Sequence, residues 1–599
     1  MRAAVGLLCF VLAGALAPRA VAQSIIPEAE ALHAPTPARL ARLVADAGRS
    51  GWTAQAPALH TAARLAYERG SLPAAEAWLN VSRWAELFGQ SEKDFIPRWI
   101  RAVEDAHVAH ANMRRRFLVV DRPLGAQLTS ECQAWLIGNA DFSAQFFALI
   151  QPVDCLPEVL HILGGLYLHS PERFKAYAGL ALAIAVVYDV PPPPDWPHGQ
   201  VGPTALARRW PAPVTAFDWW VKQDQLGHTY QRLTRLPAEE LKFVVDAAAP
   251  LDELAWSQEV ANYPLNQLAK AYTMIRYRQD RMANRVGIWN DGAYTLPAIL
   301  GAGGICVDQA YFACQVGKAR GVPTLLFSGV GTDGRHAWFG FLDGDRRWVL
   351  DAGRFAEQRF VTGFALDPQT WGRISDHELQ FLTEGFRRLP SYGLSRAHAA
   401  LAADYLAHRE PAAAANAARK AVGYERRNQL AWETLLAAEA ALGRGAKQRE
   451  ATLREAAQAF QRYPSLEAVY ANRFAASLRA RGETSAAEAE ENRIVRKNRG
   501  DRTDVSLQQL RMNLVRSMST QPLAEQIRTY NSLVDTLGRG AGMGFFDQIV
   551  VVFAEHLQRL GRRTEAIHAV ERARRSLKVE PGRQLDQEFE RLRNQVGGK

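Results

Sequence analysis

Residues 303–330 read GGICVDQAYFACQVGKARGVPTLLFSGV, and this stretch decides the fold that we predict for the surrounding chain. The run from Cys306 to Gly317 has helical spacing, with small side chains recurring on one face at i, i+4, i+7 and i+11. Gly321-Val322-Pro323 then interrupts the helix, and Thr324 to Val330 has the character of a strand. We expect a helix that begins at or near Cys306 and packs closely against a strand.

Cys306 is the candidate nucleophile of this segment. Gly303 and Gly304 come directly before it and suggest a turn that leads into the helix. Free backbone N–H groups and the helix dipole favour negative charge at such a position, so a thiolate at Cys306 would be stabilised. Taken alone, Cys306 is also compatible with a buried, inert cysteine, which is a common role for this residue type.

A β-hairpin is expected after the first strand. The runs 336–342 and 346–351 are β-like and are joined across Asp343-Gly344-Asp345. If Asp343-Gly344 forms a two-residue type I′ turn, Leu342 pairs with Asp345 and His336 faces Asp351. A turn at Gly344-Asp345 would instead place His336 opposite Gly353. The favoured turn predicts a histidine and a carboxylate on one face, about 4.5–5.5 Å apart at Cβ.

Cys306, His336 and Asp351 would together supply the groups needed for nucleophilic acyl transfer. The thiolate attacks a carbonyl, the histidine moves the proton, and the carboxylate orients the imidazole. With the motifs GGIC, GVP, HAWFGF and WVLDAGRF in this order, the segment resembles the transglutaminase-like superfamily of papain-type cysteine enzymes. The resemblance covers roughly 100 of the 599 residues. It implies a compact α+β core and a thioester intermediate, in a group that includes peptidases, amidases, cross-linking transferases and members without activity.

Other parts of the site are less well defined by the sequence. The resemblance places the oxyanion stabiliser upstream of the cysteine, where Trp289, Asn290 and Tyr294 are the nearest candidates, each of which is also compatible with simple packing. The backbone N–H of Cys306 is a further possible donor. No compact acidic loop of the calcium-binding kind is found, so we expect no metal and no cofactor.

Helical repeats are predicted on both sides of this segment. Residues 51–90 have a helix-turn-helix pattern in which Ala63, Gly70 and Ala75 stand 7 and 5 apart. The same spacing returns at two places near the C-terminus, and a degenerate copy has Ala403 and Ala415 with Glu410 in place of the glycine. The two further copies are Ala475, Gly482, Ala487 and Ala554, Gly561, Ala566. Small residues at a helix crossing with glycine at the turn resemble tetratricopeptide repeats; an unrelated all-helical bundle is the alternative.

The predicted fold is therefore multidomain and mostly α, with helical-repeat regions flanking one α+β transglutaminase-like domain. The expected order is a signal peptide (1–22), an N-terminal repeat-like region (23–110), a helical domain (111–285), the transglutaminase-like domain (286–390) and C-terminal repeats (391–599). In the helical domain, Pro191 to Pro194 must interrupt any helix. Ala178 to Val187 is expected to be a buried core helix, because it is too short to span a membrane.

The N-terminus has the features of a secretory signal peptide. Arg2 is followed by an apolar run from Val5 to Leu16 and by the small-residue cleavage site Ala20-Val21-Ala22. Cleavage after Ala22 would lower the net charge from +10 to +8 and direct the protein to a periplasm or out of the cell. An uncleaved anchor is the alternative. Cys132 and Cys155 would then lie where a disulfide can persist, but the sequence does not decide whether they are bridged.

Composition limits the classes of function. The chain is 48% hydrophobic and 22% charged, with no apolar run of 18 residues, so we expect packed cores and no spanning helix. The positive charge is diffuse and accompanied by no nucleic-acid motif, although it is compatible with an acidic surface polymer. We expect an exported cysteine-dependent enzyme acting on peptide or protein amides, with hydrolysis slightly preferred to transamidation. The alternative is a non-catalytic scaffold whose repeats bind a protein partner; the oligomeric state stays open.

Overall fold

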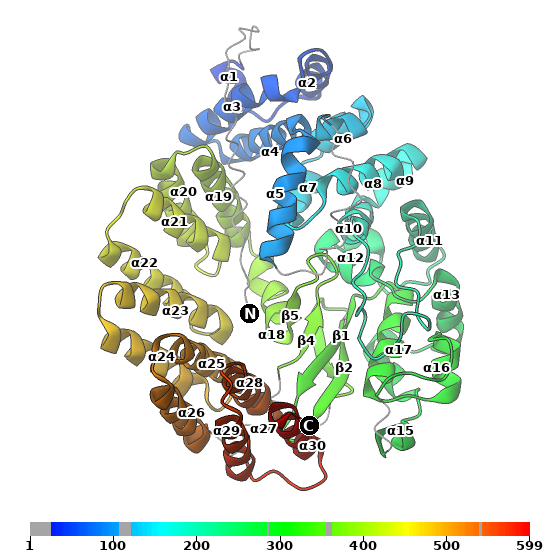
Figure 1. Ribbon diagram of the computed structural model, residues 1–599. Helices are drawn as coiled ribbons and strands as arrows, with labels where there is room; N and C mark the ends of the chain where they lie inside the picture. Colours follow the sequence, from blue (N-terminus) through cyan, green and yellow to red (C-terminus); the bar gives the residue numbers. More distant parts are fainter. Residues whose placement is uncertain (1–25, 107–120, 284–286, 355–361, 538–541, 599) are drawn as a thin grey trace.

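The structure is a computed structural model that describes residues 26–106, 121–283, 287–354, 362–537 and 542–598. Helices dominate it, and its one sheet within these residues has five antiparallel strands in the order β3-β2-β1-β4-β5. Figure 1 shows helices from both halves of the chain arranged around this sheet. The expectation of a mostly α chain is confirmed. The predicted signal peptide and its cleavage site lie outside the described residues.

The N-terminal region is built from short helical hairpins. Its helices are α1 (Glu28–Ala31), α2 (Pro37–Ser50), α3 (Ala56–Glu68), α4 (Leu72–Gly89) and α5 (Glu92–Asp105). The predicted helix-turn-helix corresponds to α3 and α4. Gly70 takes a φ of 83° in the turn, and Ala63 and Ala75 are fully buried where the two helices pack. A side chain at Gly70 would be strained at this φ, which explains why the turn uses glycine.

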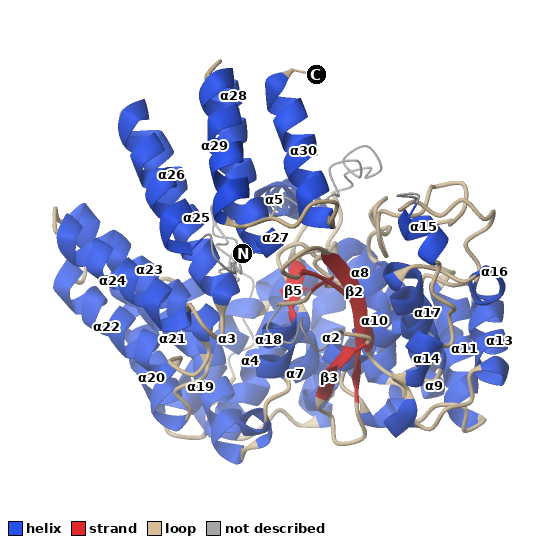
Figure 2. Cartoon of the chain, turned by 90° about the horizontal axis from the view of Figure 1, so that it is seen from below, coloured by secondary structure: helices blue, strands red, loops and turns tan. Residues whose placement is uncertain are grey.

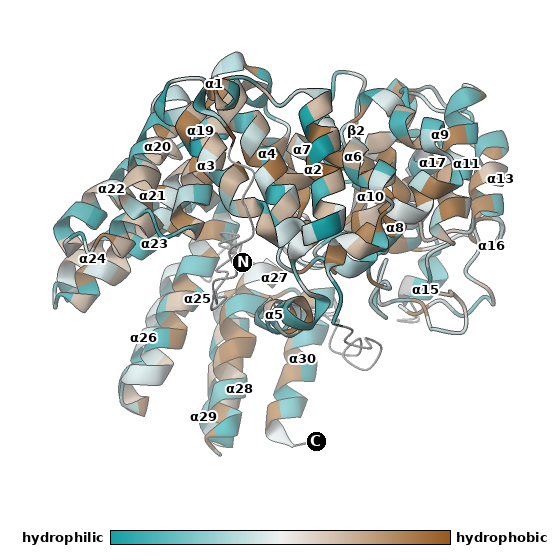
Figure 3. Cartoon of the chain, turned by 90° about the horizontal axis from the view of Figure 1, so that it is seen from above, coloured by the Kyte–Doolittle hydropathy of each residue, from teal (hydrophilic) through white to brown (hydrophobic). Residues whose placement is uncertain are grey.

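A second group of helices lies between the N-terminal region and α17 in the chain. It comprises α6 (Ser130–Gly138), α7 (Ala140–Leu149), α8 (Leu156–His169), α9 (Pro171–Ala176), α10 (Ala178–Tyr188), α11 (Pro213–Gln225), α12 (Ala238–Val245), α13 (Leu251–Val260), α14 (Lys270–Thr273), α15 (Gln279–Ala283) and α16 (Leu296–Ala302). As predicted, α10 is a core helix, with every residue from Leu180 to Val187 buried. Figure 3 shows hydrophobic residues on this helix. Pro191–Pro194 is not helical, and Cys132 and Cys155 are free, buried thiols.

The sheet follows α17 (Cys306–Ala319), as the quoted segment predicts. Its strands are β1 (Thr324–Val330), β2 (Arg335–Leu342), β3 (Trp348–Ala352), β4 (Phe364–Leu366) and β5 (Arg373–Ser375), followed by α18 (Asp376–Leu382). Helix α17 packs against the face of β2 that carries Ala337, Phe339 and Phe341, which belong to the same core. The opposite face carries Trp338 and Leu342 in a smaller core. Figure 2 shows the strands enclosed by helices.

The register between β2 and β3 differs from the prediction. Leu342 pairs with Trp348 rather than with Asp345, and the ladder shifts again between Phe339 and Phe341, so that Phe339 pairs with Ala352. The reason lies in the turn, where the N–H of Asp343 donates to the carbonyl of Arg347 and closes a three-residue loop. The Asp343 carboxylate accepts from two backbone N–H groups of this loop. Three-residue hairpin loops of this kind use one left-handed residue, here Arg346 at φ 58°.

The C-terminal third is a run of helical hairpins. They comprise α19 (Pro390–Ala407), α20 (Pro411–Tyr424), α21 (Gln429–Ala441), α22 (Ala446–Ala459), α23 (Pro464–Ala480), α24 (Thr484–Asn498), α25 (Thr503–Thr520), α26 (Leu523–Leu537), α27 (Gly542–Phe545), α28 (Val551–Arg559), α29 (Arg563–Ser576) and α30 (Gln584–Gly597). The hairpins predicted around Gly482 and Gly561 are confirmed, and both glycines have positive φ.

The degenerate copy has the predicted spacing but is shifted by one residue. Ala402 and Ala414 are the fully buried alanines of the α19–α20 crossing, whereas Ala403 and Ala415 are partly exposed. Arg409, with a φ of 63°, stands where the other copies have glycine. The prediction that Glu410 replaces the glycine is therefore wrong by one position, because the alanine-rich sequence offers two adjacent sets with the same spacing.

Candidate functional site

Cys306 is the first residue of α17, as predicted, and the two glycines before it are required by close packing. Gly303 has a φ of 77°, and a Cβ there would lie 2.5 Å from the carbonyl oxygen of Arg276. A Cβ at Gly304 would collide with the side chain of Asp308. The backbone therefore passes between two fixed neighbours immediately before Cys306, which sets where the helix can begin.

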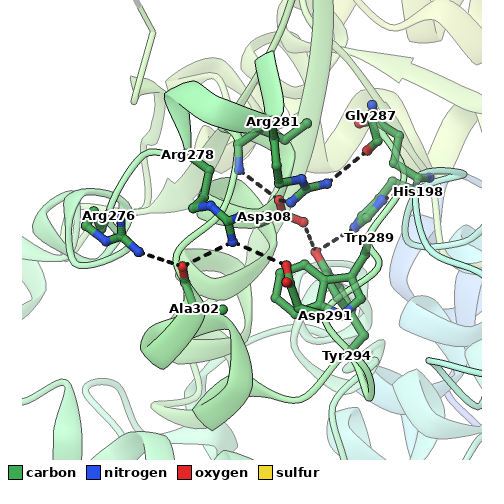
Figure 4. A network of polar contacts seen from close by, with 12 residues as sticks. His198, Arg276, Arg278, Arg281, Gly287, Trp289, Asp291, Tyr294, Ala302 and Asp308 are labelled. Atoms are coloured by element: carbon green, nitrogen blue, oxygen red, sulfur yellow. Dashed lines mark hydrogen bonds and ion pairs between the residues drawn. The ribbon is translucent and has the colours of Figure 1, made fainter. Parts of the chain in front are cut away.

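Asp308 anchors this helix start through a buried polar network (Figure 4). Its carboxylate accepts from the N–H of Ile305 at 2.8 Å, from Arg281 at 2.8 Å and from the hydroxyl of Tyr294 at 2.8 Å. His198 lies 2.9 Å from the same hydroxyl, and burial lowers its pKa to about 3, so its ring is neutral at physiological pH. The partners of the Asp308 carboxylate are buried and hydrogen-bonded themselves, and such a network holds the N-terminus of α17 in place.

The three oxyanion candidates are not free to serve a substrate in the predicted way. The single N–H of the Trp289 ring donates to the carbonyl of Gly292 at 3.1 Å. The Tyr294 hydroxyl proton is committed to Asp308. Asn290 is exposed on the surface. Trp289 and Tyr294 therefore have structural roles, and backbone N–H groups at Cys306 remain the donors available at the thiol.

The thiol of Cys306 is surrounded mainly by backbone donors. Hydrogen bonds from the N–H groups of Ala337, Val307 and Cys306 itself each lower its pKa. Burial acts in the other direction and is the larger effect, so the net pKa lies above the ordinary cysteine value. The helix start favours the thiolate in the expected direction, but desolvation exceeds the contribution of these donors.

Tyr272 links the cysteine to the strand that carries the histidine. Its hydroxyl donates to the carbonyl of Ala337 at 2.9 Å, while Ala337 also supplies one N–H to Cys306. The Tyr272 ring packs so closely on Gly353 that a Cβ there would lie 2.5 Å from a ring carbon. Gly353 has a φ of 88°, so glycine is needed for both space and backbone conformation.

His336 is buried at the start of β2, next to Ala337. Its Nε2 lies 2.7 Å from the carbonyl oxygen of Gly353. A carbonyl only accepts, so Nε2 carries the proton of the neutral ring and Nδ1 carries the lone pair. The ring lies 6.0 Å from that of Trp338, with which it shares a face of the strand. The imidazole is thus oriented by Gly353, the residue that the alternative turn would have placed opposite it.

Asp351 does not take the predicted place beside His336. Its side chain is exposed, and the observed register brings it level with the stretch between Phe339 and Phe341. The prediction of a His336–Asp351 pair is wrong, because the three-residue loop shifts the whole of β3. The structure therefore brings the backbone N–H of Ala337 to Cys306, sets His336 beside Trp338 and Gly353, and leaves the carboxylate of the predicted triad at the surface.

The C-terminal helices hold the turn that precedes His336. In this turn the carbonyls of Thr332 and Asp333 accept from backbone N–H groups of Met543 and Leu585 at 3.1 and 3.0 Å. Arg335 forms ion pairs with residues of the same C-terminal region, reaching Asp547 at 2.7 Å and Glu588 at 3.1 Å. Figure 2 shows α27 and α30 near this end of the sheet. More than 200 residues separate these partners in the sequence, so sequence reasoning offered no signal for them.

Comparisons with known proteins give no match: no family model matches the chain, and no curated protein or solved structure matches it significantly. Among the described residues, none of the helices combines the length and apolar character that crossing a bilayer requires.

Proposed function

We propose that the protein is an exported cysteine-dependent acyl-transfer enzyme that acts on peptide or protein amide bonds through a thioester on Cys306. The observation that carries this proposal is the set of backbone N–H groups, from Ala337 and Val307, that point at the sulfur at the start of α17. Such donors stabilise developing negative charge, on the sulfur or on the oxygen of a carbonyl that it attacks. The resemblance assigns His336 as the base, and this residue comes immediately before Ala337 on β2.

In the proposed reaction, Nδ1 of His336 takes the proton of Cys306 as the sulfur attacks the carbonyl carbon of the amide. The resulting tetrahedral adduct breaks its C–N bond, and His336 returns the proton to the departing amine. His336 then removes a proton from water, which attacks the thioester and releases the acid and the thiol. An amine in place of water would give transamidation. Gly353 orients the ring throughout by accepting from Nε2.

The raised pKa of Cys306 decides between two ways of activating a cysteine. A resting thiolate–imidazolium pair requires a depressed thiol pKa, whereas burial raises it here. The proposal therefore uses His336 as a general base during attack, in the manner of serine hydrolases, rather than a preformed ion pair. The resemblance to transglutaminase-like enzymes supports the assignment of Cys306 and His336, and the signal-peptide pattern supports export.

A non-catalytic scaffold is the second candidate, and the same raised pKa favours it. A thiol that stays protonated and a carboxylate that lies at the surface are both compatible with a site that has lost turnover. In that case the long run of C-terminal helical hairpins would carry the function by binding a protein partner.

Trapping of the acyl-enzyme tests the proposal. Full-length mature protein is mixed either with a library of peptide amides or with an activated ester that can acylate a reactive cysteine. The reaction is quenched in acid and analysed by intact mass and peptide mapping. We expect an acyl adduct on Cys306 that hydroxylamine removes, and none in Cys306→Ala. Cys314 is the matched control thiol, because burial raises its pKa to about 12. Absence of any adduct on Cys306 with both substrate classes would contradict the proposal and favour the scaffold.

A further inference from the structure

A second cluster of potential ligands lies far from Cys306, where the N-terminal hairpin meets the first C-terminal hairpin. His60 on α3 comes together with Asp404 and His408 at the end of α19, and one ligand atom from each lies within 4.8 Å of the others. Asp404 and His408 are four residues apart and so share one helix face. The cluster joins segments more than 300 residues apart in the sequence, so the expectation of no metal, which considered local motifs only, did not test it.

The distances in this cluster are close to those of a metal site. Nδ1 of His60 lies 2.9 Å from a carboxylate oxygen of Asp404, and Nε2 of His408 lies 3.2 Å from one of Glu86. Tetrahedral zinc with bonds of about 2.0–2.1 Å separates its ligand atoms by about 3.4 Å. The two imidazole rings are stacked with centroids 3.7 Å apart, so a modest rotation of each ring would direct a nitrogen at a shared ion.

His60 is the independent indication of a ligand. The residue is only 8% exposed, yet neither ring nitrogen has a hydrogen-bond partner of acceptable geometry among the described residues. The nearby oxygen of Asp404 is within distance but out of line. Buried polar atoms are rarely left unsatisfied in folded proteins, and each exception calls for an explanation such as an ion. A metal bound to His60 would supply the missing partner.

His408 is already arranged as a metal ligand would be. Its Nδ1 lies 2.9 Å from the backbone carbonyl of Asp404, which fixes the proton on that nitrogen. A second-shell hydrogen bond of this kind is usual for metal-binding histidines and leaves the other nitrogen to the ion. Nε2 lies 3.2 Å from a carboxylate oxygen of Glu86, so Glu86 is positioned to complete the coordination.

The charge around the cluster favours a cation. Three carboxylates, those of Asp404, Glu86 and Glu410, face the two imidazoles, and Arg64 pairs with Glu410 at 2.7 Å. Arg83 also lies near Asp404 and Glu86, and its side chain donates to the carbonyl of Ala400 at 3.0 Å. The cluster therefore gathers three carboxylates against two arginines.

We propose that His60, Asp404, His408 and Glu86 bind a divalent transition metal, with Zn²⁺ as the best match to a nitrogen and oxygen ligand set. The ion would tie α3 and α4 to α19 and so fix the N-terminal hairpin on the C-terminal repeats. This site is structural and independent of the acyl-transfer chemistry at Cys306. Its closed, four-residue ligand set resembles structural rather than catalytic zinc sites, which keep an open position.

The test uses tag-free, full-length mature protein stripped with a chelator and then titrated with Zn²⁺ by calorimetry and with Co²⁺ by visible absorption. We expect one equivalent to bind, with the ligand-field bands of four-coordinate cobalt, and the apparent melting temperature to rise on metal addition. His60→Asn and His408→Asn are each expected to weaken binding by at least about 100-fold.

His398→Gln is the matched control, because this buried histidine also lies on α19 and contacts α3 through the Tyr67 hydroxyl at 2.7 Å. It should keep one equivalent of metal and the wild-type affinity. Circular dichroism of the apo variants establishes that they fold, and Asp404→Asn provides a second ligand variant if one histidine variant does not. The proposal is overturned if the wild type binds no metal, or if binding is equal in wild type and all ligand variants.

Discussion

The two halves of the candidate site are held in opposite ways. Cys306 stands on a helix start that is fixed by a buried, fully connected network around Asp308, within one continuous core. His336 stands at a strand start whose preceding turn is held by partly exposed contacts to the C-terminal helices. Cys306 is therefore positioned by contacts within one core, whereas the position of His336 depends on how distant parts of the chain assemble.

The largest expected effect is on chemistry itself. Cys306→Ala should abolish acyl-enzyme formation, and His336→Gln should slow it by about 10³-fold or more, because the attack then lacks its general base. Single-turnover acylation rates, measured by quenched-flow mass spectrometry, provide the check. A wild-type acylation rate in His336→Gln would contradict this assignment, because His336 would then have no role in the attack.

The next largest effect is expected on the free energy of unfolding, through the network around Asp308 that holds the start of α17. Asp308→Ala removes the buried ion pair with Arg281, and breaking a buried pair costs about 3–5 kcal/mol. Urea unfolding followed by circular dichroism measures this loss. Asp345→Ala is a suitable control, because this carboxylate is exposed in the β2–β3 loop and its loss should cost less. Equal losses in the two variants would show that the network does not anchor α17.

A smaller effect is expected at the histidine half. Arg335→Ala removes the ion pairs with Asp547 and Glu588, and exposed pairs of this kind contribute only about 0–1 kcal/mol to stability. We nevertheless expect the acylation rate to fall several-fold, because the turn before His336 is loosened. Arg347→Ala, in the exposed hairpin loop, is the control and should leave the rate unchanged. An unchanged rate in Arg335→Ala would show that the C-terminal helices do not help to position the base.

The smallest effect is predicted for the residue that the sequence assigned to the triad. Asp351→Asn should change stability by less than about 0.5 kcal/mol and the acylation rate by less than about two-fold, because the side chain is exposed. Differential scanning calorimetry and the same single-turnover assay measure both quantities. A large loss of rate without loss of stability would restore Asp351 to a catalytic role and contradict the observed register.

Features of the site that depend on residues close together in the sequence could be predicted, and features that depend on distant residues could not. The helix start at Cys306 was predictable because glycine and helical spacing are local signals, and the structure confirms both. The raised pKa of Cys306 was not predictable from the sequence. It results from burial, which depends on Tyr272 and β2, and these lie outside the local segment. The mostly α character of the chain and the helical hairpins around Gly70, Gly482 and Gly561 were also predictable from local signals and are confirmed.

The prediction of the β2–β3 register was wrong for a specific reason. Asp343-Gly344 is the sequence of a two-residue turn, but the Asp343 carboxylate instead accepts two backbone N–H groups and stabilises a wider loop. Arg346 accepts a left-handed conformation there while forming an ion pair with the buried Glu240 at 2.6 Å. That tertiary contact, more than 100 residues away in the sequence, accompanies the change of register and has no signature in the hairpin itself.

The account's central claim is that His336, oriented by Gly353 and not by Asp351, is the base for Cys306. The most direct measurement is the single-turnover acylation rate of Cys306 in His336→Gln and in Asp351→Asn, each compared with the wild type under the same conditions. The account predicts a loss of about 10³-fold in the first variant and a rate within about two-fold of wild type in the second. Comparable losses in both variants, or no loss in either, would contradict it.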